Sequence, residues 1–192
     1  MSILLIVTAY LLGSIPTGLL LAKYAAGVDV RKRGSGNIGA TNVLRSAGKG
    51  LGILTLLGDI LKGLIPVIIA QKYFNDPFIT GATALCAFLG HTFSIFLKFK
   101  GGKGVATAFG VFLAISWKVS IAAFLLFLTM VLIFRYVSLG SITGAALFPL
   151  LLFLIERMPV ITVFSVIISI IIIIRHKDNI KRLLKNEESK IF

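Results

Sequence analysis

The sequence predicts an all-α integral membrane protein with about seven transmembrane helices, an external N-terminus and a cytoplasmic C-terminus, built as one polytopic domain over residues 1–192. Three observations support this prediction. Hydrophobic residues make up 57% of the chain and charged residues 14%, whereas about a quarter of an average soluble domain is charged. Seven apolar runs have the length of a bilayer span or slightly less, and the charged residues gather between these runs.

The apolar runs are helix candidates because only helices and closed barrels satisfy their backbone in lipid, and these runs lack the alternating polarity of barrel strands. The first run begins at Ile3 with no basic residue before it. A cleaved signal peptide would carry its positive charge first, so we expect a retained helix with its N-terminus outside. The expected helices cover residues 3–22, 51–71, 78–97, 105–117, 119–134, 137–155 and 159–174.

Residues 105–134 are the segment on which the number of spans depends. Trp117 and Lys118 interrupt this segment, which forms either one long helix or two short ones. With two helices, sixteen basic residues lie on the cytoplasmic side and three outside, whereas one helix would leave ten inside and eight outside. Because basic residues favour the cytoplasmic side, we predict two helices and seven spans. Every glycine-rich, polar or histidine-bearing segment then lies on the cytoplasmic face.

The composition also excludes several kinds of site. Cys86 is the single cysteine, so the chain has neither an internal disulfide nor a cysteine–histidine zinc site. We expect no metal and no cofactor. The net charge of +13 is divided among short segments between apolar runs rather than spread over one polar domain, so we expect no nucleic acid partner. The sequence indicates no obligate protein partner.

The first polar segment, residues 33–42, is rich in glycine and in neutral hydrogen-bonding side chains. Its spacing matches GxGxxG, but a membrane helix on either side replaces the βαβ unit that a dinucleotide site needs. Glycines let backbone amides point at an anion, so the segment is a candidate substrate site. The alternative is a flexible loop that binds lipid headgroups. The candidate residues are Gly34, Ser35, Gly36, Asn37, Thr41 and Asn42, followed by Arg45.

The second polar segment, residues 98–104, leads directly into the fourth apolar run. Three glycines and a lysine at the start of a helix favour phosphate, because the exposed N–H groups and the helix dipole are both attractive to anions. The segment is not a Walker A loop, since Val105 stands where serine or threonine is required. A basic turn at the membrane surface is the alternative. The candidate residues are Gly101, Gly102, Lys103 and Gly104.

Residues 135–141 form the third polar segment, which continues to Gly144. Gly140 and Gly144 make a small-xxx-small pair, which favours close helix packing. Ser138 and Ser141 either cap a helix or face a substrate, and the sequence does not separate these roles. We retain Ser141 as a candidate substrate-binding residue.

Residues 175–182 form the fourth polar segment, at the cytoplasmic end of the last apolar run. His176 and Asn179 are three residues apart and share a face if the helix continues. A histidine at a polar interface can act as a base or a hydrogen-bond donor. A polybasic anchor for anionic lipid is the alternative.

Asp59 and Lys62 lie inside the second apolar run, three residues apart. Charged groups at such depth are costly and need partners, so we expect them to pair with each other. His91 is expected within the third helix, about seven residues before its cytoplasmic end.

In these segments the chain resembles the PlsY family of bacterial acyl-phosphate:glycerol-3-phosphate acyltransferases. The resemblance covers nearly the whole chain in the right order, and its hallmarks are residues 13–16, 33–42, 59–63, 90–104 and 176–183. It implies an enzyme of the bacterial cytoplasmic membrane that transfers a fatty acyl group from acyl phosphate to the 1-hydroxyl of glycerol 3-phosphate, giving lysophosphatidic acid and phosphate. The implied partners are these two substrates and membrane lipid.

The resemblance also implies roles for individual residues. The glycine-rich second segment with Lys103 is associated with the phosphate of glycerol 3-phosphate, the first segment supplies Ser35 and Arg45, and the last supplies His176 and Asn179. In the family, a glycine usually precedes a glutamate by two residues, and here Asn186 precedes Glu188. Asparagine can adopt the left-handed conformation that glycine adopts at a helix end, so the departure is mild.

Two other classes fit the sequence less well. Acyltransferases that use acyl-CoA or acyl carrier protein depend on an HxxxxD pair, and neither histidine is followed by aspartate at that spacing. A transporter of organic phosphate would carry its polar residues on broken helices near the membrane midplane, whereas these segments share one face. We expect direct acyl transfer with Ser35 as a hydrogen-bonding residue, the proton passing either to His176 or to a substrate phosphate.

Overall fold

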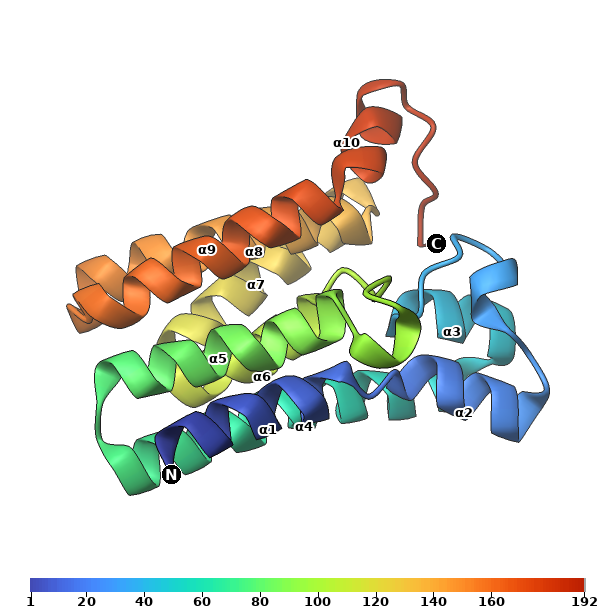
Figure 1. The fold of residues 1–192 in the computed structure, drawn as a ribbon. Coiled ribbons are helices and arrows are strands. Elements are labelled where there is room, and N and C mark those ends of the chain that lie inside the picture. The colour runs from blue at the N-terminus through green and yellow to red at the C-terminus, as the bar shows by residue number, and fades with distance from the viewer. Residues whose placement is uncertain (192) are drawn as a thin grey trace.

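The computed structural model describes residues 1–191, and within them the regular structure is entirely helical. The longer helices lie side by side in a bundle, with α1 packed on α4 and α5, α4 on α6, α7 on α8, and α9 on both α5 and α8 (Figure 1). The elements are α1 (Ser2–Ser14), α2 (Thr17–Ala26), η1 (Val30–Lys32), α3 (Ala40–Ala47), α4 (Lys49–Phe74), α5 (Pro77–Thr92), η2 (Ile95–Leu97), α6 (Val105–Ile115), α7 (Trp117–Phe134), α8 (Val137–Leu151), the π-helical turn η3 (Leu152–Glu156), α9 (Pro159–Arg175) and α10 (Lys177–Leu184).

The all-helical membrane fold is confirmed. Among residues 1–191, five helical segments are long and apolar enough to cross a membrane, and six are if the bent pair α9 and α10 forms one span. The apolar helix α6 has only 11 residues. Many large apolar side chains are exposed, Ile133 and Val163 among them, as expected of a surface that contacts lipid. The count of seven spans and the orientation of the chain in the membrane remain predictions.

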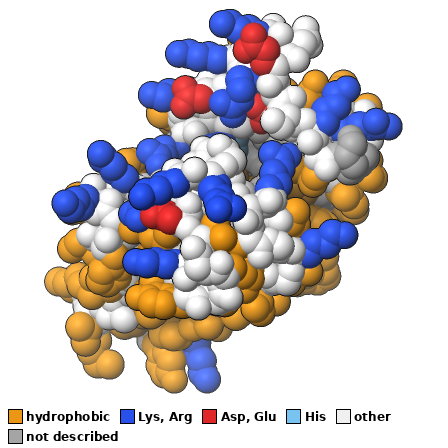
Figure 2. All heavy atoms as spheres, turned by 90° about the vertical axis from the view of Figure 1, so that its right-hand side faces the viewer, with side chains coloured by type: hydrophobic (Ala, Val, Ile, Leu, Met, Phe, Trp, Pro, Cys, Tyr) orange, Lys and Arg blue, Asp and Glu red, His pale blue; other side chains and the backbone are white. Residues whose placement is uncertain are grey.

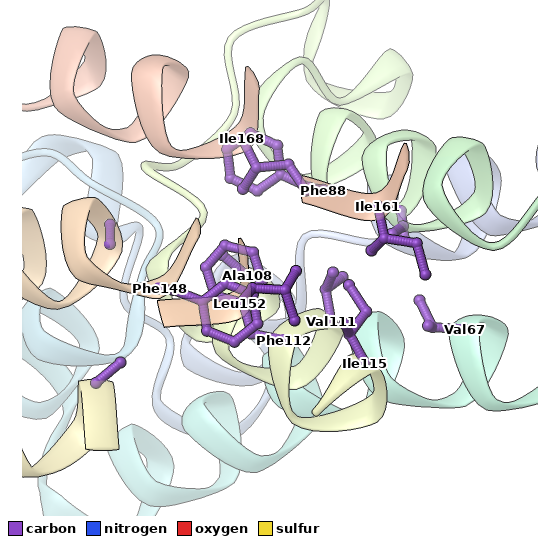
Figure 3. Packing of buried hydrophobic residues seen from close by; sticks show 14 of the residues in the cluster. Val67, Phe88, Ala108, Val111, Phe112, Ile115, Phe148, Leu152, Ile161 and Ile168 are labelled. Carbon is purple, nitrogen blue, oxygen red and sulfur yellow. The ribbon is translucent and has the colours of Figure 1, made fainter. Parts of the chain in front are cut away.

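Aromatic and branched side chains between the helices form the core. Phe112 of α6 and Phe148 of α8 stack in parallel with their ring centroids 3.8 Å apart. Phe88 of α5 and Ile168 of α9 are fully buried and lie beside each other (Figure 3). Gly140 and Gly144 of α8 approach the backbone of α7 closely, since a Cβ atom at Gly140 would lie 2.7 Å from a carbonyl oxygen of that helix. The predicted small-residue packing is confirmed.

The predicted break inside residues 105–134 is confirmed as well. Helix α6 ends at Ile115, and Ser116 leaves the helical conformation with φ −151° and ψ 106°. The Ser116 hydroxyl accepts a hydrogen bond from the Val119 N–H at 3.3 Å, which caps α7, and donates one to Glu156 at 2.8 Å. A single long helix is therefore excluded.

Two other expected helices differ in the structure. The first run is divided at Ile15, because Pro16 lacks an N–H and disfavours the helical conformation of the residue before it. The third helix ends at Thr92 instead of continuing to residue 97, since Phe93 turns away with ψ 59°. His91 lies within this helix as expected, but it is the penultimate residue and not about seven residues from the end.

The polar segments gather at one end of the bundle. Helix α3, the loop of residues 98–104, α10 and the C-terminal segment lie together there, while the N-terminus and the turns joining α4 to α5 and α8 to α9 lie at the opposite end (Figure 1). Seen from the polar end, lysine and arginine side chains cover much of the surface (Figure 2). The prediction that these segments share one face is confirmed.

Candidate active site

Lys103, Asn179 and Glu188 meet at the polar end, although Lys103 is 76 residues from Asn179 in the sequence. The Lys103 ammonium donates a hydrogen bond to Oδ1 of Asn179. The side-chain N–H of Asn179 donates to Oε1 of Glu188 at 2.5 Å. Two further donors reach the same carboxylate, the Ser138 hydroxyl at 2.8 Å and Nε of Arg182 at 2.7 Å. These five side chains, Lys103, Ser138, Asn179, Arg182 and Glu188, form what we call the lysine cluster.

The glycine-rich loop is held between the ends of α5 and α9. The N–H groups of Gly101 and Gly102 donate to the carbonyls of Thr92 and His91 at 3.2 and 3.1 Å. Arg175, the last residue of α9, donates to the carbonyl of Gly101 at 2.8 Å and to that of Gly102 at 3.2 Å. These contacts hold the backbone of the two residues that precede Lys103.

The same contacts correct one expectation about the loop. We expected the amides of Gly101 and Gly102 to bind phosphate, but in this structure both are already used by α5. Their glycine identity has a packing reason, since a Cβ atom on Gly102 would lie 2.3 Å from Nε2 of His91. Gly104 has a positive φ of 81°, and a Cβ atom on it would lie 2.3 Å from the Phe88 ring. The loop therefore contributes to the site chiefly by placing Lys103.

His176 lies at the bend between α9 and α10, which meet at 55° and do not continue as one straight helix. It is 3% exposed, and its Nδ1 donates to the carbonyl of Ile172 at 2.8 Å. This hydrogen bond leaves Nε2 as the acceptor of a neutral ring. Burial lowers the pKa of His176 to about 4, with a further contribution from the positive charge of Lys103. At neutral pH His176 is therefore an uncharged hydrogen-bonding group and a weak base.

The charges of the lysine cluster influence one another. Burial lowers the pKa of Lys103, and the negative charge of Glu188 partly offsets this effect. Burial alone would raise the pKa of Glu188, but the hydrogen bonds from Asn179, Arg182 and Ser138 outweigh it and hold that pKa below its usual value. Glu188 is thus an anion that orients the donors around it. Among residues 1–191, the structure contains no group of three His, Cys, Asp or Glu side chains that could hold a metal ion.

Asn42 organises the first polar segment from within. Its side-chain nitrogen donates to the carbonyls of Val30, Arg33 and Asn37 at 2.7 to 3.1 Å, and its Oδ1 accepts from the Ser35 N–H at 3.1 Å. The residue is 3% exposed. We expected Asn42 to contact a substrate, but its polar atoms are used to shape the loop that carries Ser35.

The remaining candidates of this segment lie on or near the surface. Gly34 and Gly36 both have positive φ angles, of 56° and 70°, and a Cβ atom at Gly34 would lie 2.3 Å from Oδ1 of Asn42. Ser35 and Thr41 are exposed, and Asn37 accepts from the Gly39 N–H at 3.0 Å. Ser35 is therefore presented at the polar end by a loop of defined shape.

The C-terminal segment links the first polar segment to the lysine cluster. Arg45 at the end of α3 donates to the carbonyl of Lys190 at 3.4 Å, and the Ile191 N–H donates to the carbonyl of Arg135 at 2.9 Å. Glu188, two residues before Lys190, belongs to the lysine cluster. Arg45 and Lys103 are thereby connected through the tail. The structure shows no direct contact between their side chains.

Sequence reasoning missed three contributors to the site. It left the role of Glu188 undefined, and it preferred Ser141 to Ser138. In the structure the Ser141 hydroxyl donates to the carbonyl of Val137 in its own helix, whereas Ser138 reaches Glu188. Arg175 was counted only as a basic residue at the end of a span. The position of Ser138 one turn before Ser141 and facing the polar end could have drawn attention to it.

The comparison with known proteins agrees with this geometry. A family model described as glycerol-3-phosphate acyltransferase matches residues 3–186. The chain is similar to the protein of that name from Geotalea daltonii, with 55% identity over 187 residues that cover 97% of this chain and 96% of the relative. It is also similar to the protein of that name from Geobacter sulfurreducens, with 53% identity over 189 residues, 98% of this chain and 96% of the relative.

Two solved structures share the fold. One is described as PlsY (YgiH), an integral membrane glycerol 3-phosphate acyltransferase, in its glycerol 3-phosphate form, and superposes with a TM-score of 0.96 at 45% sequence identity, covering 100% of this chain and 96% of that one. The other is described as the lysophosphatidic acid form of the same protein, with a TM-score of 0.94 at 45% identity and coverage of 100% and 95%.

Proposed function

Because the chain belongs to the glycerol-3-phosphate acyltransferase family, we propose that it uses acyl phosphate as its donor and acylates the 1-hydroxyl of glycerol 3-phosphate. The products are 1-acyl-glycerol 3-phosphate and inorganic phosphate. The observation that supports this proposal most directly is the lysine cluster, in which Lys103 reaches the polar end of an apolar bundle. One substrate has a lipid tail and both carry phosphate, so a cationic site at the edge of a lipid-facing bundle suits both.

Electrostatics is the main physical requirement of this reaction. Two phosphate-bearing anions must come close together, and cationic side chains with backbone donors offset their repulsion. We assign Lys103 to the phosphate of glycerol 3-phosphate and Arg45 to the phosphate of the donor. Ser35, Asn37 and Asn179 orient the glycerol hydroxyl and the acyl carbonyl.

The chemical step is a direct attack. The 1-hydroxyl oxygen of glycerol 3-phosphate attacks the acyl carbonyl carbon, and the bond from that carbon to the phosphate oxygen breaks. The departing phosphate takes the bonding electrons. Because the pKa of His176 is lowered to about 4, His176 is a poor proton acceptor, and a phosphate oxygen is the better one. His176 then serves as a neutral hydrogen-bond acceptor that positions the substrate through Nε2, while the hydroxyl proton passes to the phosphate oxygen.

The donor is tested with purified protein. Palmitoyl phosphate, palmitoyl-CoA and palmitoyl-acyl carrier protein are offered separately with labelled glycerol 3-phosphate. We expect labelled lysophosphatidic acid only from palmitoyl phosphate, since a mixed anhydride is activated without the HxxxxD machinery that thioester enzymes use. Comparable rates from either thioester would refute the donor assignment. Uptake of label into vesicles without acylation would favour the transporter class instead.

Direct transfer makes a separate prediction for Ser35. A covalent serine mechanism needs a base in hydrogen-bond reach and usually a third group to orient it. His176 is oriented by a backbone carbonyl instead of a carboxylate, and His91 is packed inside the bundle end. Incubation with labelled acyl phosphate and no acceptor should therefore leave no acyl ester on the denatured protein by mass spectrometry. An acylated Ser35 peptide that passes its label to added glycerol 3-phosphate would establish a ping-pong mechanism.

We place the protein in the bacterial cytoplasmic membrane with its polar end in the cytoplasm. In a Cys86→Ser background, cysteines introduced at Lys49, Lys100 and Lys190 should resist an impermeant thiol reagent in intact cells. A cysteine at Lys72, at the opposite end of α4 from Lys49, should be labelled and serves as the matched control. Labelling at Lys49, Lys100 and Lys190 with protection at Lys72 would contradict this orientation.

A further inference from the structure

A buried ionic group lies beneath the glycine-rich loop. Asp59 and Lys62 of α4 form the expected ion pair, with Nζ of Lys62 2.8 Å from Oδ1 of Asp59 and side chains exposed by only 7% and 2% for the lysine and the aspartate. His91 of α5 faces the same carboxylate, with its Nδ1 3.6 Å from Oδ1 of Asp59, a close polar contact that is longer than a hydrogen bond. We call Asp59, Lys62 and His91 the buried triad. The mechanism proposed above makes no use of it.

The cost of this arrangement calls for an explanation. Removing charged groups from water carries a large desolvation penalty, and well-packed apolar residues often serve stability as well or better. A buried ion pair is therefore weak support for a purely stabilising role. The position of the triad in the fold suggests what it does.

On one side, the triad contacts the loop that carries Lys103. The carbonyl of His91 accepts the Gly102 N–H at 3.1 Å. The imidazole lies so close that a Cβ atom on Gly102 would approach Nε2 to 2.3 Å. The ring of His91 thus forms the surface against which Gly102 rests, and Lys103 is the next residue.

On the other side, the triad holds the break between α1 and α2. Nζ of Lys62 donates to the carbonyl of Ile15 at 2.8 Å, at the point where Pro16 interrupts the helix. Ser94 donates to the carbonyl of Ser14 at 2.5 Å, and the Tyr10 hydroxyl donates to the carbonyl of Phe93 at 2.8 Å. The end of α1 is thereby tied to the end of α5. The triad therefore connects α4 with the end of α1 and the end of α5. The relative placement of these helices determines where the loop of residues 98–104 begins.

We propose that Asp59, Lys62 and His91 are positioning residues for Lys103. Asp59 holds the His91 ring in the orientation that supports Gly102, Lys62 holds Asp59 and the end of α1, and the loop then presents the Lys103 ammonium to the phosphate of glycerol 3-phosphate. This inference rests on the proposed function of Lys103 as a phosphate ligand.

A double-mutant cycle read by binding tests the proposal. Glycerol 3-phosphate affinity is measured by titration without an acyl donor on the wild type and on the single variants Asp59→Asn, His91→Phe and Lys103→Ala. It is also measured on Asp59→Asn and His91→Phe each combined with Lys103→Ala. Asp59→Asn and His91→Phe alone should weaken binding by about fivefold or more, and in the Lys103→Ala background each should add less than about twofold, because residues that act through one group are not additive. The Michaelis constant for acyl phosphate should stay unchanged.

Thr83→Val is the matched control. Thr83 lies on α5 like His91, is fully buried, and its hydroxyl has no hydrogen-bond partner. This variant should leave glycerol 3-phosphate affinity within about twofold of the wild type in either background. His91→Phe keeps the ion pair and replaces the imidazole with a somewhat larger aromatic ring that has no nitrogen, so it provides a second test should Asp59→Asn not accumulate.

Several results would overturn the proposal. Weakening that is the same with and without Lys103 would show that the triad acts elsewhere, and normal affinity with reduced thermal stability would make it a structural element only. Failure of both variants to fold would likewise make the triad a structural element only. If Lys103→Ala binds glycerol 3-phosphate as tightly as the wild type, Lys103 is not a phosphate ligand and the proposal fails. If glycerol 3-phosphate binds as expected but a thioester is the donor, only the donor assignment fails, because the cycle contains no donor.

Discussion

Replacing Lys103 with alanine is expected to raise the Michaelis constant for glycerol 3-phosphate by about ten- to hundredfold, because a charge-assisted hydrogen bond to phosphate is worth about 1.5–3 kcal/mol. Lys103 is half-buried and held by Asn179, so it reaches the substrate from a defined position. Steady-state kinetics with each substrate varied in turn provides the measurement. The turnover number should fall less than the ratio of turnover number to Michaelis constant.

Lys100→Ala is the control for this variant. Lys100 lies in the same loop but is exposed, so its removal should change the Michaelis constant for glycerol 3-phosphate by less than about twofold. If Lys103→Ala raises the Michaelis constant for acyl phosphate instead, the two phosphate sites are exchanged in our scheme and Arg45 becomes the ligand of glycerol 3-phosphate.

Glu188→Ala is expected to lower turnover by about tenfold or more, because it removes the acceptor shared by three side chains and each hydrogen bond to a charged group contributes about 1.5–3 kcal/mol. Asn179 would lose the contact that orients its amide toward Lys103, and Arg182 would lose its partner. The variant should also unfold at a lower temperature. Both effects are measurable on purified protein by activity assay and thermal denaturation.

Glu187→Ala is the matched control, since Glu187 is the exposed neighbour of Glu188 and should be replaceable without loss. The pH dependence gives a second check. Because the pKa of Glu188 is lowered in the folded state, its stabilising contribution is present at neutral pH and is lost as the pH falls through that lowered pKa. Wild-type protein should therefore lose thermal stability on acidification more steeply than Glu188→Ala does. Equal turnover in Glu187→Ala and Glu188→Ala would contradict the role assigned to Glu188.

The sequence by itself determined the helical membrane fold, the break between α6 and α7, the polar end and the Asp59–Lys62 pair. These features depend on local or averaged properties. Apolar length identifies a helix in lipid, charge at depth requires a partner, and the distribution of basic residues between the apolar runs favours a break at Trp117 and Lys118. Apolar length, charge and the order of residues along the chain can be read from the sequence without knowing the contacts between helices.

Only the tertiary structure decided how the candidate residues cooperate. It showed that α5 stops at Thr92, which brings His91 against Gly102, and that the amides of the loop are used by carbonyls of α5. It also placed Glu188 beside Asn179 and Lys103. These outcomes depend on which backbone groups meet across the bundle. Helix ends leave carbonyls without partners inside the helix, and the chain segment that satisfies them is selected by packing between distant parts of the sequence.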